Sequence, residues 1–187
     1  MINIDHHITN EHFGDLNLVD SESAATAQLV LRLIHTLGVS LDERMATCLL
    51  TALADDTQCF RTSSTTPESL RDGAELMVAG AKLADIVDRI FNARSLSELV
   101  LWGEILSTLR MEDGIVWAWD THQMREGLGT SSGEGRGIVN LLAGVREAGV
   151  AIVFKQYKEE LIEVSMRSGQ DVDISLVAVH FGGGGHP

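Results

Sequence analysis

The first half of the chain contains several amphipathic helical patterns but one clear strand, and this imbalance limits the folds open to it. Apolar residues recur at helical spacing over 24–37, 42–54 and 69–78, whereas residues 1–4 form a short apolar strand. An amphipathic helix must bury its apolar face against another layer, and one strand of this length is too small to provide it. The first half is therefore either all-helical or part of a sheet whose other strands lie outside this sequence. Because the chain also stops within a glycine-rich turn, we expect it to be clipped at both ends.

The second half has the pattern of a mixed α/β domain. Strands are predicted over 114–121, 150–157 and 161–167, and the last two form a hairpin. Helices are predicted over 138–148 and 172–179.

The domain boundary falls within a long helical pattern at 83–106, whose weakest point is 92–97. We therefore expect a first domain at 1–95, a helical linker at 96–110 and a second domain at 111–187. The fold class is α/β.

The charge balance excludes a protein that holds long nucleic acid through a basic surface. The chain carries 27 Asp and Glu against 14 Lys and Arg, a formal net charge of −13. A phosphorylated substrate stays open, because metal ions or a few arginines can neutralise phosphate locally. No apolar run approaches the ~20 residues that span a bilayer, and no signal peptide is visible. Cys48 and Cys59 have no metal-binding spacing, so we expect free thiols and a cytoplasmic protein without a membrane partner.

Two acidic motifs in the first half are candidates for metal binding. Asp5, His6 and His7 follow the first strand, at the sheet edge where α/β proteins bind ligands, although they could equally be surface residues. Adjacent residues of an extended strand point to opposite sides, so the two histidines need not share an ion. Asp56 follows an apolar helix and could bridge two ions, but ordinary turn chemistry explains it as well.

Two motifs in the second half are candidates for binding phosphate. Ser165 and Arg167 end a strand, and a guanidinium can bind phosphate through two hydrogen bonds, although a solvated strand end is the plainer explanation. The glycine run 182–186 can bring backbone N–H groups close to an anion, or can be a mobile linker. The small-residue loop 129–137 precedes a helix and could receive a phosphate, but it is also typical of a plain surface loop.

Taken together and in order, these motifs resemble those of the DHH phosphoesterase family. IDHHITNEHFGDLNLVDSESAATAQLV is similar to its name-giving motif, and LLTALADDTQCFRTSSTTPESL is similar to its later DTG motif. EVSMRSGQDVDISLVAVHFGGGGHP resembles the C-terminal associated domain with its GGGH turn. The nearest branch is that of the nanoRNases, which also dephosphorylate 3′-phosphoadenosine 5′-phosphate, and RecJ-like exonucleases are more distant. The resemblance implies the C-terminal part of a parallel-sheet DHH domain joined to a smaller substrate-binding domain.

The resemblance also implies roles for individual residues of the first domain. His6 is expected to ligate one of two manganese ions, with magnesium as the alternative cation, and Asp56 to bridge the pair. Asp5 is expected to orient a histidine, and His7 to face the scissile phosphate as a ligand or proton donor. The reaction implied is hydrolysis of the phosphoester by metal-activated water.

In the second domain the resemblance implies contacts to the distal phosphate or sugar of the substrate. The residues expected there are Arg167, Ser165, Gly183, Gly184, Gly185 and His186. The partners implied are short single-stranded RNA or a nucleotide, not long duplexes, and a homodimer is compatible with the family.

Two departures from the family pattern matter. The DTG glycine is replaced by Gln58, and the earlier motifs that carry most of the metal ligands are missing, so that His6 and Asp56 alone leave each ion short of ligands. Alternatives therefore stay open: a non-catalytic nucleotide-binding module at 110–187, a single-strand exonuclease, or an enzyme acting on cyclic dinucleotides or inorganic polyphosphate.

Overall fold

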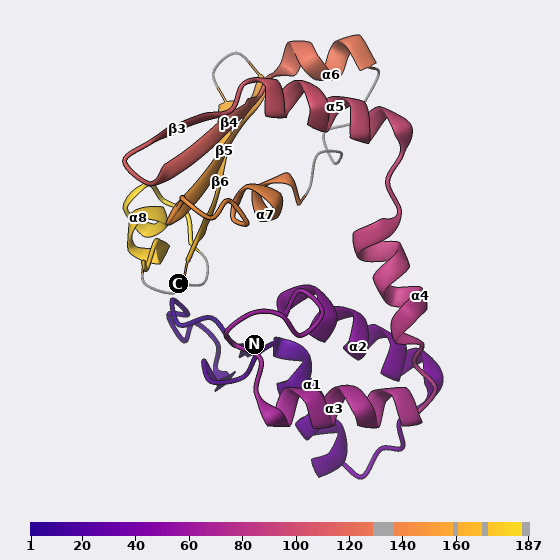
Figure 1. Ribbon diagram of the computed structural model, residues 1–187. Helices are drawn as coiled ribbons and strands as arrows, with labels where there is room; N and C mark the ends of the chain where they lie inside the picture. The colour runs from indigo at the N-terminus through magenta and orange to yellow at the C-terminus, as the bar shows by residue number, and fades with distance from the viewer. Residues whose placement is uncertain (129–136, 159–160, 170–171, 185–187) are drawn as a thin grey trace. The chain divides into compact units, whose positions relative to one another are not determined.

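A computed structural model describes residues 1–128, 137–158, 161–169 and 172–184 of the chain. The chain divides into two compact units, Met1–Ala93 and Arg94–Pro187 (Figure 1). The helix in the expected linker 96–110 belongs to the second unit, because its Leu101 and Ile105 are fully buried in that unit's core.

The first unit contains two parallel strands where the sequence indicated one. Strand β1 (Ile2–Asp5) pairs with β2 (Leu16–Val19), in a register that aligns Ile2 with Leu16 and Asp5 with Val19. The prediction of a single strand was wrong. Strand β2 was missed because it has only four residues, one of which is Asn17. Its apolar pattern is therefore too short to be recognised in the sequence.

The three amphipathic helices of the first unit are confirmed. They are α1 (Thr26–Thr36), α2 (Glu43–Asp56) and α3 (Pro67–Val78). Helix α3 begins with a capping box, in which Thr66 and Ser69 bond each other's backbone N–H, and Pro67 fits its first turn because the missing N–H is not needed there. The apolar faces of the helices meet in one core, which includes Leu31, Leu50, Leu53 and Leu76.

The long helical pattern at 83–106 is three elements in the structure. Helix α4 (Leu83–Val87) continues as a π-helical turn, η1 (Asp88–Asn92), and the chain then breaks before α5 (Leu96–Ser107). The π turn closes where the Ala93 N–H donates to the carbonyl of Asp88 at 2.7 Å. The break lies at the weakest point of the sequence pattern, and Ser95 caps the new helix by accepting from the Glu98 N–H.

The second unit is built on a four-stranded mixed sheet in the order β3-β4-β5-β6 (Figure 1). Its strands are β3 (Arg110–Glu112), β4 (Ile115–Asp120), β5 (Val150–Lys158) and β6 (Leu161–Ser168). Strands β4 and β5 are parallel, and the outer pairs are antiparallel. The predicted hairpin and the strand at 114–121 are confirmed, whereas the short β3 was not predicted. Each unit therefore combines helices with a sheet, and the predicted α/β class is confirmed.

Short helices complete the second unit: α6 (His122–Leu128), α7 (Ile138–Leu142) and α8 (Ser175–His180). Helix α7 is shorter than the predicted 138–148, since Gly144 disfavours its continuation and the chain there forms isolated turns. Helix α6 was not predicted. Alternate residues of β4 and β5 pack against α5 and α7 to form the core, which includes Val116, Ala118, Ala151, Val153, Ile138 and Leu142.

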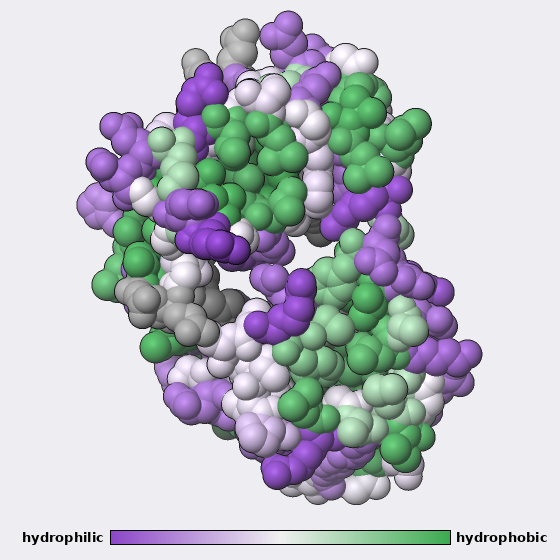
Figure 2. All heavy atoms as spheres, viewed as in Figure 1, coloured by the Kyte–Doolittle hydropathy of each residue, from purple (hydrophilic) through white to green (hydrophobic). Residues whose placement is uncertain are grey.

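On the face shown in Figure 2, both units mix hydrophilic and apolar side chains. Such a mixture is ordinary for folded domains and by itself assigns no partner. None of the helices in the described segments combines the length and the apolar character needed to cross a membrane.

Candidate functional site

The carboxylate of Asp5 organises the loop that follows β1. Its Oδ1 atom accepts hydrogen bonds from the backbone N–H of His6 at 2.8 Å and of His7 at 3.2 Å, and from Nδ1 of His7 at 2.7 Å. The strand ends at Asp5, so the histidines do not alternate across a sheet. Their rings instead meet edge-to-face, with centroids 4.8 Å apart. Asp5 thus orients the ring of His7, which is half-exposed.

Asp5 is held in its ionised form. Partial burial raises the pKa of this carboxyl, but hydrogen bonds from the side chains of His7 and Asn10 and from the two backbone N–H groups outweigh the burial. The net effect keeps the pKa of Asp5 well below its usual range. A permanent negative charge beside His7 is therefore a fixed feature of this loop.

The imidazole of His6 is buried and lies between two partners. Its Nδ1 atom is 3.1 Å from the carbonyl oxygen of Ser23, and its Nε2 atom is 3.5 Å from Oδ2 of Asp56. Because a carbonyl oxygen can only accept, Nδ1 must carry the hydrogen, and in the neutral ring Nε2 then has the lone pair. The structure therefore brings the two predicted metal ligands, His6 and Asp56, together.

Asp56 ends α2 and is followed by an unusual left-handed turn. Gln58, Cys59 and Phe60 have φ angles of 46°, 59° and 62°, which for residues with a Cβ costs about 1–2 kcal/mol each. The buried Thr57 holds this turn, since its hydroxyl donates to the carbonyl of Leu53 and accepts from the Phe60 N–H. Gln58 thus adopts the conformation that the family's glycine would adopt without strain.

The donor set of this region suits a divalent cation but does not complete its coordination. Imidazole nitrogen and carboxylate oxygen are ordinary ligands for manganese and related ions. Within the described residues, however, no cluster of three or more His, Cys, Asp or Glu side chains is placed to hold a metal. His6 and Asp56 would supply only part of the coordination of such an ion.

The second unit contains a cavity of about 240 Å³ between β5, β6 and the start of α7. Its lining includes both of the strand residues predicted to bind substrate, Ser165 and Arg167. The remaining lining residues are Asp120, Gly137, Ile138, Val139, Asn140, Val153, Lys155 and Glu163.

The register of β5 and β6 explains why these polar residues share one face. Ser165 pairs with Val153 and Glu163 with Lys155, so alternate residues of both strands point toward the cavity. Arg167 is oriented by Asn140, whose side-chain oxygen accepts from Nε at 3.1 Å. Sequence reasoning missed Lys155, which is 8% exposed. Its place opposite Glu163 in the predicted hairpin was the signal that could have found it.

A buried ion pair lies at the end of β4 beside this cavity. Asp120 and Arg125 are almost fully buried, and two hydrogen bonds of 2.8 Å and 2.7 Å join the guanidinium to the carboxylate. This pair ties α6 to the sheet and was not singled out from the sequence.

The glycine run is described only in part. Gly182 has a φ of 78°, and the N–H of Gly183 donates to the carbonyl of Ala178 at 2.8 Å, so these residues cap α8. Gly184 is exposed, whereas Gly185 and His186 lie outside the described residues. The loop 129–136 also lies outside them. A substrate contact by this turn therefore stays a prediction.

Comparisons with known proteins agree with the motifs. No family model matches the chain. Its sequence is 42% identical over 186 residues to the bifunctional oligoribonuclease and PAP phosphatase NrnA of Thermus thermophilus, covering 100% of this chain and 56% of that protein. It is 26% identical to the protein of the same name from Bacillus subtilis, covering 100% of this chain and 60% of the relative.

A solved structure is similar over nearly the whole chain. The crystal structure of an exopolyphosphatase-related protein from Bacteroides fragilis matches with a TM-score of 0.87 and 27% identity, covering 99% of this chain and 56% of that one. The chain thus spans little more than half the length of the proteins it matches. The ordered motifs, the fold and these similarities, which extend over the whole of this chain, confirm its resemblance to the DHH phosphoesterase family.

Proposed function

We propose that the chain forms part of a manganese-dependent phosphoesterase that hydrolyses short oligoribonucleotides and 3′-phosphoadenosine 5′-phosphate. The similarity to proteins named bifunctional oligoribonuclease and PAP phosphatase supports this substrate class. The single observation that carries the proposal is the meeting of His6 Nε2 and the Asp56 carboxylate after β1 and α2.

The residues of the first unit have distinct parts in the proposed reaction. His6 and Asp56 would hold a cation, which when bound lowers the pKa of water and offsets the charge that develops on the phosphoryl oxygens. Asp5 keeps Nδ1 of His7 engaged, so Nε2 is the atom with which His7 would contact the phosphate or give a proton to the leaving oxygen. Magnesium is the alternative cation.

The cavity of the second unit would bind the part of the substrate away from the cleaved bond. Lys155 and Arg167 are cationic, and Ser165 adds a hydroxyl on the same face. Charge-assisted hydrogen bonds from such groups suit a phosphate. The size of the cavity fits a piece of one nucleotide, and the net charge of −13 opposes a long duplex.

We also propose a cytoplasmic location, because Cys48 and Cys59 are both free thiols. We propose a homodimer as the assembly, because this assembly is compatible with the family that the chain resembles.

The test is an assay, with manganese, of the chain extended by an N-terminal segment that carries the earlier family motifs. Substrates are a 5′-phosphorylated diadenylate and 3′-phosphoadenosine 5′-phosphate, and the products are AMP and inorganic phosphate. We expect hydrolysis that EDTA abolishes and that His6→Ala lacks, together with manganese binding by equilibrium dialysis. A well-folded extended protein that cleaves neither substrate would contradict the proposal.

A further inference from the structure

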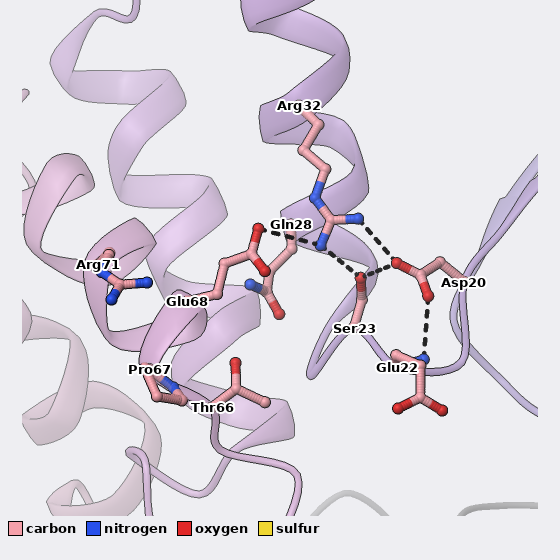
Figure 3. A pocket seen from close by; sticks show the side chains of 9 residues that line it. All are labelled: Asp20, Glu22, Ser23, Gln28, Arg32, Thr66, Pro67, Glu68 and Arg71. Carbon is pink, nitrogen blue, oxygen red and sulfur yellow. Dashed lines mark hydrogen bonds and ion pairs between the residues drawn. The ribbon is translucent and has the colours of Figure 1, made fainter.

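A second cavity, of about 690 Å³, lies in the first unit beside the turn that supports His6 (Figure 3). Its lining residues are Asp20, Glu22, Ser23, Gln28, Arg32, Thr66, Pro67, Glu68 and Arg71. The turn 20–23 connects β2 to α1, and Arg32 reaches it from α1.

Arg32 binds this turn at two side chains. Its Nη1 atom donates to Asp20 Oδ2 at 2.8 Å, and its Nη2 atom donates to the hydroxyl of Ser23 at 3.1 Å. The same hydroxyl donates to Asp20 Oδ2 at 2.8 Å, so the three side chains form a closed triangle of hydrogen bonds (Figure 3). Glu68 of α3 lies 3.6 Å from Nη2 and holds the guanidinium from the other side.

The triangle is connected directly to His6 and to the strand that precedes it. The backbone carbonyl of Ser23, which is buried, accepts from Nδ1 of His6. The N–H of Asp20 donates to the carbonyl of Asp5 at 3.1 Å. The position of Ser23 therefore decides whether its carbonyl stays within reach of the imidazole.

We propose that Arg32 is a positioning residue that fixes the orientation and tautomer of His6 through the side chains of Asp20 and Ser23. This inference rests on the proposed function for the view that Nε2 of His6 binds a cation. With Ser23 held in place, Nδ1 carries the hydrogen and Nε2 faces Asp56 with its lone pair. Partners that orient a ligating histidine in this way typically change metal affinity by about 10–100-fold when removed.

The guanidinium suits this task better than an ammonium group would. It presents two donors in a fixed plane to two different acceptors, whereas the lysine ammonium is a flexible point charge. The same cavity offers a matched control, because within the described residues Arg71 takes part in none of these hydrogen bonds although it lines the cavity (Figure 3).

The test compares Arg32→Ala with Arg71→Ala in the full chain. The histidine tautomers are measured without metal, and the manganese affinity is measured separately. Proton–nitrogen correlation spectra at about pH 8, where free imidazoles are neutral, report the tautomer of each histidine, and His6→Gln identifies the His6 signals. We expect the Nδ1–H tautomer of His6 in the wild type and in Arg71→Ala. In Arg32→Ala we expect a substantial Nε2–H population, and a manganese affinity at least about tenfold weaker.

A His6 tautomer that is the same in Arg32→Ala as in the wild type overturns the positioning role, as does an Nε2–H tautomer in the wild type. If Arg32→Ala does not fold, Ser23→Ala provides the same test, because it removes the hydroxyl and keeps the carbonyl. A tautomer change without manganese binding in any variant would support the positioning role while contradicting the cation-binding role proposed for His6.

Discussion

Nε2 of His6 lies 3.5 Å from a carboxylate oxygen of Asp56, although one residue follows a strand and the other ends a helix. The imidazole is almost fully buried, and the carboxylate is partly open to solvent, so a cation could approach from the side of Asp56. We therefore expect His6→Ala to weaken manganese binding by at least about tenfold, because it removes one of two converging ligands. Equilibrium dialysis of the chain measures this.

The control for this variant is His35→Ala. His35 is on α1 in the same unit and bonds Glu75 at the surface, away from the turn that supports His6. Equal losses of manganese in both variants would show that the ion binds histidines without selection and would contradict the assignment.

Gln58 allows the strain in the turn after Asp56 to be measured. Within a helix or strand, glycine lowers the stability of a protein by about 0.5–1 kcal/mol relative to alanine. At Gln58 the backbone φ is instead 46°, in the left-handed region. We expect Gln58→Gly to raise the free energy of unfolding by about 1 kcal/mol relative to Gln58→Ala, because glycine adopts this conformation without a Cβ clash. Urea unfolding of the two variants gives the difference. Alanine proving as stable as glycine would mean that the turn is not strained at this residue.

Gly73 on α3 tests the packing behind that turn. A Cβ at Gly73 would lie 2.8 Å from Cζ of Phe60, whereas a Cβ at Gly103 on α5 would meet nothing within 4 Å. Alanine is the better helix former by about 1 kcal/mol, so Gly103→Ala should stabilise the chain by up to that amount. Gly73→Ala should be neutral or destabilising, because Phe60 must move. Denaturant unfolding of both variants, followed by tryptophan fluorescence and circular dichroism, gives the midpoints that decide this. If Gly73→Ala stabilised the chain as much as Gly103→Ala does, the clash with Phe60 would be ruled out.

The ion pair between Asp20 and Arg32 makes stability depend on pH. The hydrogen bond from Arg32, helped by that from Ser23, lowers the pKa of Asp20 despite some burial. A carboxyl whose folded-state pKa is depressed stabilises the fold above its unfolded pKa, and this contribution is lost as pH falls through the folded value. We therefore expect the wild type to lose more stability than Asp20→Asn between about pH 5 and pH 2. Both groups are partly exposed, so the difference is small. Parallel acid-unfolding curves for the two proteins would contradict this expectation.

Local patterns predicted most of the elements, and long-range pairing explains the misses. Helices α1, α2 and α3 were found because each repeats apolar residues over three or more turns. Strands β2 and β3 were missed because their few residues gain strand structure from pairing with β1 and β4, which no local pattern records.

The site could be predicted in part for the same reason. The motifs placed His6 and Asp56 at the ends of their elements, which sufficed to bring them together. Ser23 and Arg32 were not singled out, since their importance arises from hydrogen bonds across a turn and a helix. Lys155 became visible as a cavity residue once the hairpin register was known.

Arg167 is expected to be the main phosphate contact of the second unit. Its guanidinium lines the cavity with Ser165 and Lys155, and Asn140 holds Nε at 3.1 Å while Nη1 donates to the backbone of Met166. Hydrogen bonds to charged groups contribute about 1.5–3 kcal/mol. We therefore expect Arg167→Ala to weaken AMP binding by at least about tenfold in calorimetric titration of the metal-free chain.

Arg146→Ala is the matched control, because Arg146 is exposed in the same unit and does not line the cavity. Asn140→Ala should give a smaller loss than Arg167→Ala, since it frees the guanidinium without removing its charge. Unchanged AMP affinity in Arg167→Ala would show that Arg167 is not the phosphate contact, and Lys155 would be the next residue to test. It would also remove the reason for placing the distal phosphate at the end of β6.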